Sequence, residues 1–206
     1  MVVKDIQWVV MNPDDFMKEK APEEPLWKPS VLVLLVGIVN TVSSVLLAQR
    51  LGNASQAGQV ASGIASVLGA VLGLISTFAL WLLSAVLIFG IVWYLSDTEP
   101  SFRDLFRDIG WGYIPVLLAS LLNSIAYVYI LNRTSDSLPS EELQVIIESS
   151  TVLQVVSVIG ISLTIWKGFI WMFAIRRRSG LRIRTAAVIA FLVPVVEIVF
   201  SLWSLI

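Results

Sequence analysis

Residues 71–95 read VLGLISTFALWLLSAVLIFGIVWYL and contain no charged side chain. A helix that crosses the hydrocarbon core of a bilayer needs about 20 consecutive apolar residues, so this stretch is long enough to span a membrane. The uncharged region begins earlier, at Leu51, but its first part is less apolar and contains Gly52, Asn53, Ser55, Gln56, Gly58, Gln59 and Ser62. These residues predict a loop followed by a weakly amphipathic helix, with the span itself starting near Val71.

Further apolar segments of sufficient length emerge when charged residues are used as boundaries. They cover about 30–48, 110–131, 150–175 and 185–206. Hydrophobic residues make up 57% of the chain and charged residues 14%, whereas about 25% of the residues of a soluble domain are charged. The sequence therefore predicts an all-α integral membrane bundle of five transmembrane helices at 30–206, preceded by an N-terminal segment at 1–29.

Lysine and arginine are distributed unequally between the two sides of such a bundle. One side receives Lys4, Lys18, Lys20, Lys28, Arg103, Arg107, Arg176, Arg177, Arg178, Arg182 and Arg184. The other side receives Arg50 and Arg133. Because cytoplasmic connections are enriched in Lys and Arg, we expect a cytoplasmic N-terminus and an external C-terminus. The glycosylation sequons at Asn53 and Asn132 fall on the external side, which agrees with this orientation.

The absence of two residue types excludes most catalytic chemistry. The chain contains neither Cys nor His, which excludes thiolate nucleophiles, histidine triads and zinc sites built from these residues. None of the predicted spans contains Asp, which excludes an intramembrane protease with paired aspartates. A formal net charge of −1 gives no general preference for nucleic acid. We therefore expect no enzyme activity, no catalytic residues, no metal, no cofactor and no nucleic-acid partner.

Lys167 in the fourth span and Glu197 in the fifth are the ionisable side chains that lie deep inside the predicted helices. At about 1.5 Å per residue, they lie about 14 Å and 20 Å from the basic turn between the two helices, so their depths are similar. Since a charge in the membrane usually faces the bundle interior with a partner, we expect an intramembrane ion pair. The pair either fixes how the two helices dock or belongs to a transport or proton-relay path.

Uncharged polar and small residues inside the spans indicate contacts between helices. Asn40, Asn123 and Gln154 are polar residues for which hydrogen bonds between helices are the usual role, with the lining of a substrate path as the alternative. Small residues recur at four-residue spacing at Ala61, Ala65, Gly69, Gly73 and Thr77. Such a stripe lets two helices approach closely, either within one chain or between the two copies of a homodimer.

Two segments outside the spans indicate contacts at the membrane surface. A short helix is predicted to start at Asn12, which can cap it, with Pro13 at the first helical position. We expect this helix to be interfacial and to carry Phe16 and Met17 toward the membrane surface. The fourth connection concentrates Arg176, Arg177, Arg178, Arg182 and Arg184. These arginines favour anionic lipid headgroups, with an acidic cytoplasmic protein partner as the alternative.

Short motifs along the chain resemble one family of small membrane proteins. The motifs are Asn12-Pro13-Asp14-Asp15-Phe16, Glu24-Pro25-Leu26-Trp27, Phe102 with Leu105 and Phe106, and Gly112-Tyr113-Ile114-Pro115. Together with the five-helix layout, they are similar to the YIP family of Ypt/Rab-interacting proteins, in its short prokaryotic-like form. Here Ala21-Pro22-Glu23-Glu24 stands where the family has Asp-Leu-Tyr-Gly.

The resemblance implies a non-enzymatic membrane protein that organises membrane or recruits a protein partner at its cytoplasmic face. The residues implied for that face are Glu24, Pro25, Leu26, Trp27, Gly112, Tyr113 and Pro115. It also implies the cell membrane of a prokaryote or a Golgi- or ER-type endomembrane of a eukaryote. From the residues alone, the alternative is a small transporter or channel that uses Lys167, Glu197, Asn40 and Asn123.

Overall fold

The computed structural model describes residues 2–54, 59–134 and 138–203. These described residues are almost entirely helical and contain no β-strand. The long helices are α3 (Trp27–Ala54), α4 (Gln59–Leu95), α6 (Tyr113–Arg133), α8 (Thr151–Ser179) and α9 (Ile183–Trp203), and α5 (Phe102–Trp111) leads directly into α6. Five segments of the described chain, with α5 and α6 counted together, are long and apolar enough to cross a membrane. The predicted all-α fold with five helices able to span a membrane is therefore confirmed.

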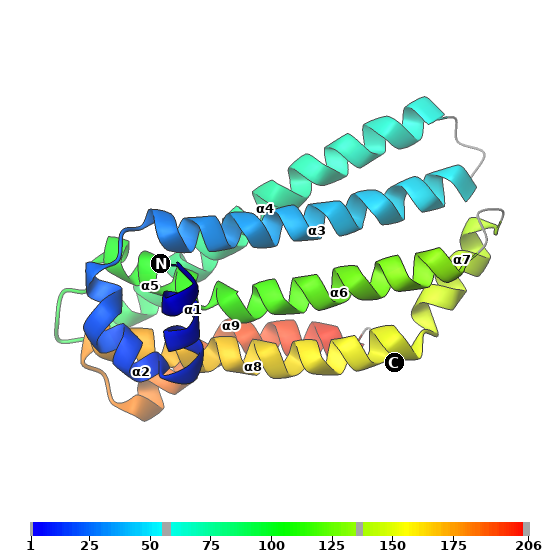
Figure 1. Cartoon of the computed structure of the whole chain (residues 1–206). Coiled ribbons are helices and arrows are strands. Elements are labelled where there is room, and N and C mark those ends of the chain that lie inside the picture. Colours follow the sequence, from blue (N-terminus) through cyan, green and yellow to red (C-terminus); the bar gives the residue numbers. More distant parts are fainter. Residues whose placement is uncertain (1, 55–58, 135–137, 204–206) are drawn as a thin grey trace.

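One end of the bundle, formed by residues 2–28, 96–112 and 176–184, is capped by the N-terminal segment, and we call it the head (Figure 1). α1 (Val2–Met11), α2 (Pro13–Asp15) and two short helical turns (Phe16–Lys20 and Ala21–Glu23) gather there with α5. Pro13 is the first residue of α2, as predicted, although the side chain of Asn12 makes no capping hydrogen bond. The opposite end, which we call the distal end, carries α7 (Ser140–Glu148), the end of α3 and the start of α4.

The first two spans belong to helices that are longer than the sequence predicts. α3 continues through Gly52 and Asn53, so the predicted loop is wrong at these two residues, whereas the helix from Gln59 agrees with the helix predicted before Val71. Ser55, Gln56 and Gly58 lie outside the described residues. Residues 51–95 contain no proline. Because each residue added to an existing helix gains a hydrogen bond without a new nucleation step, the helices extend through residues of weak helix propensity.

Small residues of α4 pack against α3 within the chain. A Cβ added at Gly73 would lie 3.1 Å from the hydroxyl oxygen of Thr41 in α3. The same hydroxyl donates a hydrogen bond of 3.2 Å to the carbonyl oxygen of Ala70. This part of the small-residue stripe therefore serves helix packing inside one chain. The side chains of Ala61 and Ala65 lie outside the described part of the structure.

The third span consists of two helices instead of one. The sequence predicts that it begins at Gly110, but α5 runs through this residue and the chain changes direction at Gly112 before α6. A side chain at Gly112 would collide with the indole of Trp171 in α8, so glycine is needed for the close approach of this junction to α8. α5 carries Arg103, Asp104, Arg107 and Asp108. These charges explain why α5 lies at the head instead of extending the span.

The protein core lies mainly in the half of the bundle nearest the head. It contains the buried indoles of Trp81, Trp111 and Trp171, and Trp81 stacks on Phe106 with ring centroids 3.9 Å apart. Along the outer faces of the spans, by contrast, large apolar side chains such as Leu83 are exposed on the protein surface. Lipid is the solvent that suits such faces, because it is as apolar as the side chains it meets.

Phe16 and Met17 pack into this core. Both side chains are buried, and Phe16 lies edge-to-face on Trp111 with ring centroids 5.1 Å apart. The prediction that Phe16 and Met17 face the membrane surface is therefore wrong. The reason is a tertiary contact. Trp8 of α1 packs against Phe16 at a centroid distance of 6.1 Å and completes an apolar environment that the local sequence does not reveal.

Candidate functional site

Lys167 and Glu197 contact each other from neighbouring helices. α8 and α9 are joined by a short turn at Gly180, whose φ of 67° is a conformation that favours glycine. The ammonium of Lys167 donates a hydrogen bond to a carboxylate oxygen of Glu197 and forms an ion pair with it. Lys167 is 3% exposed, whereas 44% of the Glu197 side chain is exposed. The two charges thus neutralise each other inside the bundle, and part of the Glu197 side chain remains accessible.

A row of cavities leads from this ion pair toward the distal end. The inner cavity, of about 170 Å³, has a polar lining of Asn40, Thr77, Tyr113, Thr164, Lys167 and Glu197. Two further cavities of about 250 and 230 Å³ are both lined by Asn40 and Asn123. Since Asn40 lines all three, we treat them as one feature and call the residues that line them the polar seam.

The polar seam collects most of the intramembrane residues singled out from the sequence. Asn40, Asn123, Lys167 and Glu197 line it. Tyr113 and Pro115, which the family resemblance implied for the partner face, line its inner cavity and not the surface of the head. Gln154 does not: it is exposed near the start of α8 and lines none of these three cavities. Gly112 lies against Trp171 and serves the packing of α8 on the α5–α6 junction.

Several serines of the polar seam were not anticipated from the sequence. They are Ser43, Ser44, Ser120, Ser157 and Ser201. Part of this set follows a pattern that could have revealed it, because Asn40, Ser43 and Ser44 are spaced i, i+3 and i+4 and so share one face of α3. The serines that α6, α8 and α9 contribute stand alone within apolar stretches and give no such signal.

A separate pocket of about 320 Å³ lies in the head, and we call it the head pocket. It is lined by Glu24, Pro25, Leu26, Ser101, Arg103, Asp104 and Arg107. It therefore joins the segment before α3 to the start of α5, two segments far apart in the sequence. Trp27 is not among the lining residues and is 55% exposed. An exposed indole at the end of a span suits the interface between membrane and water.

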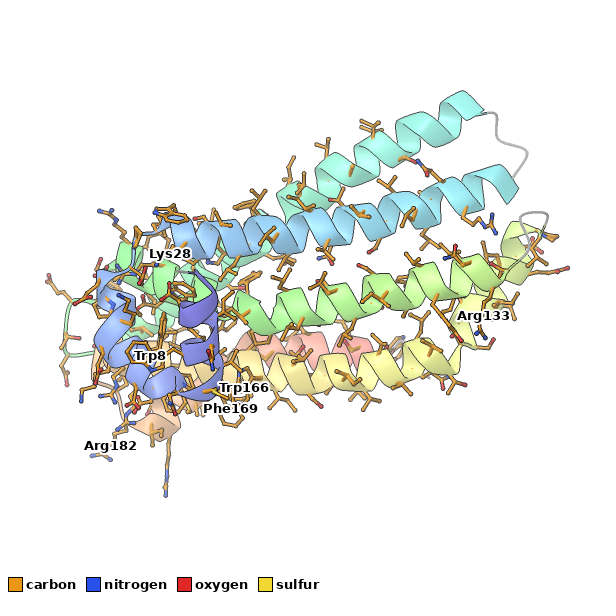
Figure 2. All side chains as sticks on the ribbon, in the orientation of Figure 1. Trp8, Lys28, Arg133, Trp166, Phe169 and Arg182 are labelled. Carbon is orange, nitrogen blue, oxygen red and sulfur yellow. The ribbon has the colours of Figure 1, made fainter. Side chains whose placement is uncertain are left out.

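Buried ion pairs hold one wall of the head pocket in place. The carboxylate of Glu24 lies 2.5 Å from the ammonium of Lys28 and 3.4 Å from that of Lys20. Lys28 also contacts Asp5 of α1 at 2.7 Å, and Figure 2 shows Lys28 at the head, at the start of α3. Because the charged groups of Glu24, Lys28 and Asp5 are buried, losing one of them would leave another without its counter-charge.

Two arginines of the fourth connection bind acidic residues of the protein itself. Arg177 forms a two-point contact with Asp14 of α2, with nitrogen–oxygen distances of 2.9 and 2.6 Å. Arg178 lies 2.6 Å from a carboxylate oxygen of Asp108, which is 1% exposed and also contacts Arg107 at 3.0 Å. These contacts tie α8 to α2 and to α5, a role that could not be predicted from the sequence.

Two of the three remaining arginines of this connection face outward. Arg182 and Arg184 are exposed and form no ion pair with another residue in the described ranges. Figure 2 shows Arg182 extending away from the head. Arg176 is half-buried in the last turn of α8. Arg182 and Arg184 are thus the two arginines best placed to meet lipid headgroups.

Both sites are suited to binding. The polar seam offers hydroxyl, amide and ammonium donors and one carboxylate within the spans, and the head pocket offers charges of both signs at the protein surface. Among the described residues, no group of three or more acidic side chains is arranged to hold a metal ion.

Comparison with known proteins places the whole chain in one family. Neither a curated protein nor a solved structure matches it. The family model described as the Yip1 domain matches residues 8–205, which include the head pocket and all five spans. The chain therefore belongs to the Yip1 domain family.

Proposed function

We propose that this Yip1-family chain is a non-enzymatic membrane scaffold that recruits a protein partner through the head pocket, at the cytoplasmic face. The observation that carries the proposal is the lining of that pocket. Glu24, Pro25 and Leu26, which stand in the family-like element before the first span, meet the start of α5 there. The family itself is generally non-enzymatic, which supports a role in binding.

The distribution of positive charge supports a cytoplasmic head. Lys28 and Arg182 lie at the head, whereas Arg133 lies toward the distal end (Figure 2). Positively charged connections are retained on the cytoplasmic side of membranes, so the head pocket faces the cytoplasm and the C-terminus is external. In a prokaryote this membrane is the cell membrane, and in a eukaryote it is an endomembrane of the Golgi or ER type.

The charges around the head pocket indicate the chemistry of the partner. Arg103 is exposed and Asp104 is partly exposed, while Glu24 and Arg107 form a buried wall behind them. A partner segment with one acidic and one basic side chain would meet both exposed charges. Charge complementarity of this kind mainly governs the choice of partner and the association rate.

Affinity capture of the intact chain from native membranes tests this proposal, with proteins and lipids identified together. The test variant is Arg103→Glu, which reverses one charge in the pocket. The matched control is Arg182→Glu, which makes the same change at an exposed head position outside the pocket. We expect the protein partner to be lost from the Arg103→Glu sample and retained by Arg182→Glu. Equal recovery of the same proteins by wild type and both variants would contradict a role for the pocket.

A further inference from the structure

The polar seam contains polar groups whose hydrogen-bonding capacity the protein does not use. Tyr113 is only 7% exposed and lines the inner cavity. No hydrogen bond joins its hydroxyl to another residue in the described ranges, and the side-chain amides of Asn40 and Asn123, which are exposed, form none there either. The ammonium of Lys167 has three N–H donors, of which one is bonded to Glu197 within the described chain. An unpaired polar group that is kept from water is costly, so the largely buried Tyr113 and Lys167 indicate an occupant that forms hydrogen bonds.

The charges at the inner cavity select the kind of occupant. Lys167 and Glu197 bring one positive and one negative charge side by side, so a simple anion placed at Lys167 would also meet the carboxylate of Glu197. A simple cation would meet the ammonium of Lys167 in the same way. A molecule that carries both charges can satisfy both groups at once, and this complementarity favours a zwitterion over either ion alone.

We propose that the inner end of the polar seam is a binding site for a zwitterion that carries a phosphate or carboxylate together with an ammonium. The acidic group accepts hydrogen bonds from Lys167 and from the hydroxyl of Tyr113. The ammonium faces Glu197, whose partly exposed carboxylate is accessible to it. Asn40 lies in the same lining and supplies an amide that can donate or accept.

The occupant could come from the bilayer as a phospholipid headgroup or from water as a free zwitterion, because both carry the same charges. The inner cavity of about 170 Å³ holds on the order of ten water-sized positions, which is enough for a headgroup-sized molecule. The site lies within the spans and shares no lining residue with the head pocket, so it does not depend on the proposed partner recruitment.

The experiment uses the full chain, purified in maltoside detergent and depleted of lipid, with the shift in its thermal unfolding temperature as the measure of binding. The probes are phosphatidylethanolamine, which is zwitterionic, phosphatidylglycerol, which is anionic, and soluble phosphoethanolamine. We expect phosphatidylethanolamine to stabilise the protein more than phosphatidylglycerol does. Stabilisation by phosphoethanolamine as well would assign the site to free zwitterions in addition to lipid, and its absence would assign it to lipid.

The test variant is Tyr113→Phe, which removes a hydroxyl that has no partner among the described residues and keeps the ring that packs in the core. Its matched control is Tyr94→Phe, because Tyr94 is 82% exposed and lies outside the polar seam. Loss of a hydrogen bond to a charged group predicts roughly tenfold weaker binding for Tyr113→Phe and no change for Tyr94→Phe. Equal stabilisation by the zwitterionic and anionic lipids, or unchanged binding by Tyr113→Phe, would overturn the proposal. The comparison of phosphatidylethanolamine with phosphatidylglycerol on the wild-type chain tests the proposal even if a variant folds poorly.

Discussion

The indole nitrogen of Trp171 in α8 donates a hydrogen bond of 2.8 Å to the carbonyl oxygen of Ile109, in the last turn of α5. The bond is buried, and Gly112 lies against the same indole. Trp171 thus joins the head helix α5, the α5–α6 junction and α8 at one point. The shapes of the head and of the inner end of the polar seam both depend on this contact.

Substitution Gly112→Ala should destabilise the protein because the added methyl group collides with the indole of Trp171. Overpacking of this kind costs about 1–3 kcal/mol. The matched control is Gly90→Ala in α4, where nothing lies within 4 Å of the added Cβ and where alanine is a better helix former. Thermal unfolding in detergent should therefore show a lower midpoint for Gly112→Ala and an equal or higher one for Gly90→Ala. Equal midpoints for the two variants would argue against the close approach at Gly112.

Charge reversal at the intramembrane pair should be destabilising in single variants and tolerated in the double variant. Lys167→Glu and Glu197→Lys each place two like charges side by side, and breaking a buried pair costs about 3–5 kcal/mol. The double variant restores opposite charges and should recover part of the unfolding midpoint. If it is no more stable than either single variant, the contact does not stabilise the docking of α8 and α9.

The ion pairs at the head should differ in strength according to burial. Asp14→Asn removes an exposed contact with Arg177, and exposed pairs contribute about 1 kcal/mol or less. Asp108→Asn removes the carboxylate from a site where it is 1% exposed and contacts both Arg107 and Arg178, so its cost should be larger. Unfolding midpoints of the wild type and of both variants, measured at low and at high salt, check the two predicted costs. A salt-sensitive loss of midpoint in Asp14→Asn that is larger than the loss in Asp108→Asn would contradict this order.

The polar seam should bind a zwitterion without transporting it across the membrane. Trp81, Tyr113 and Trp171 form buried core on the head side of the inner cavity, so the structure closes the seam at that end. Proteoliposomes that contain the wild-type chain and those that contain Glu197→Gln should therefore show the same low flux of small zwitterions. Robust flux that depends on Glu197 would instead support a transporter and would argue against the scaffold.

The features that could be predicted from the sequence are those that depend on neighbouring residues or on the membrane. The five spans were predictable because backbone groups in hydrocarbon must form helices, and uncharged stretches such as residues 71–95 reveal them. The meeting of Lys167 and Glu197 needed only a count of residues from a short turn, since the turn makes α8 and α9 neighbours.

The features that could not be predicted depend on contacts between distant segments. The burial of Phe16 needs α1 and Trp111, and nothing near residue 16 indicates them. The continuation of α3 through Gly52 and Asn53 has a different cause, because propagation of an existing helix outweighs their weak helix propensity. The head pocket needs residues 24–26 and the start of α5 to come together, which is a matter of tertiary structure.

The proposed partner site requires that the head and the distal end lie on opposite sides of the membrane, with the head in the cytoplasm. The natural chain contains no cysteine, so single cysteines can be introduced without background at the exposed positions Glu99, in the head, and Glu142, in α7 at the distal end. Labelling of oriented membranes with an impermeant thiol reagent measures the side directly. We predict that Glu99→Cys reacts only from the cytoplasmic side and Glu142→Cys only from the opposite side. Reaction of both cysteines from the same side would contradict the five-span arrangement on which the proposed partner site is based.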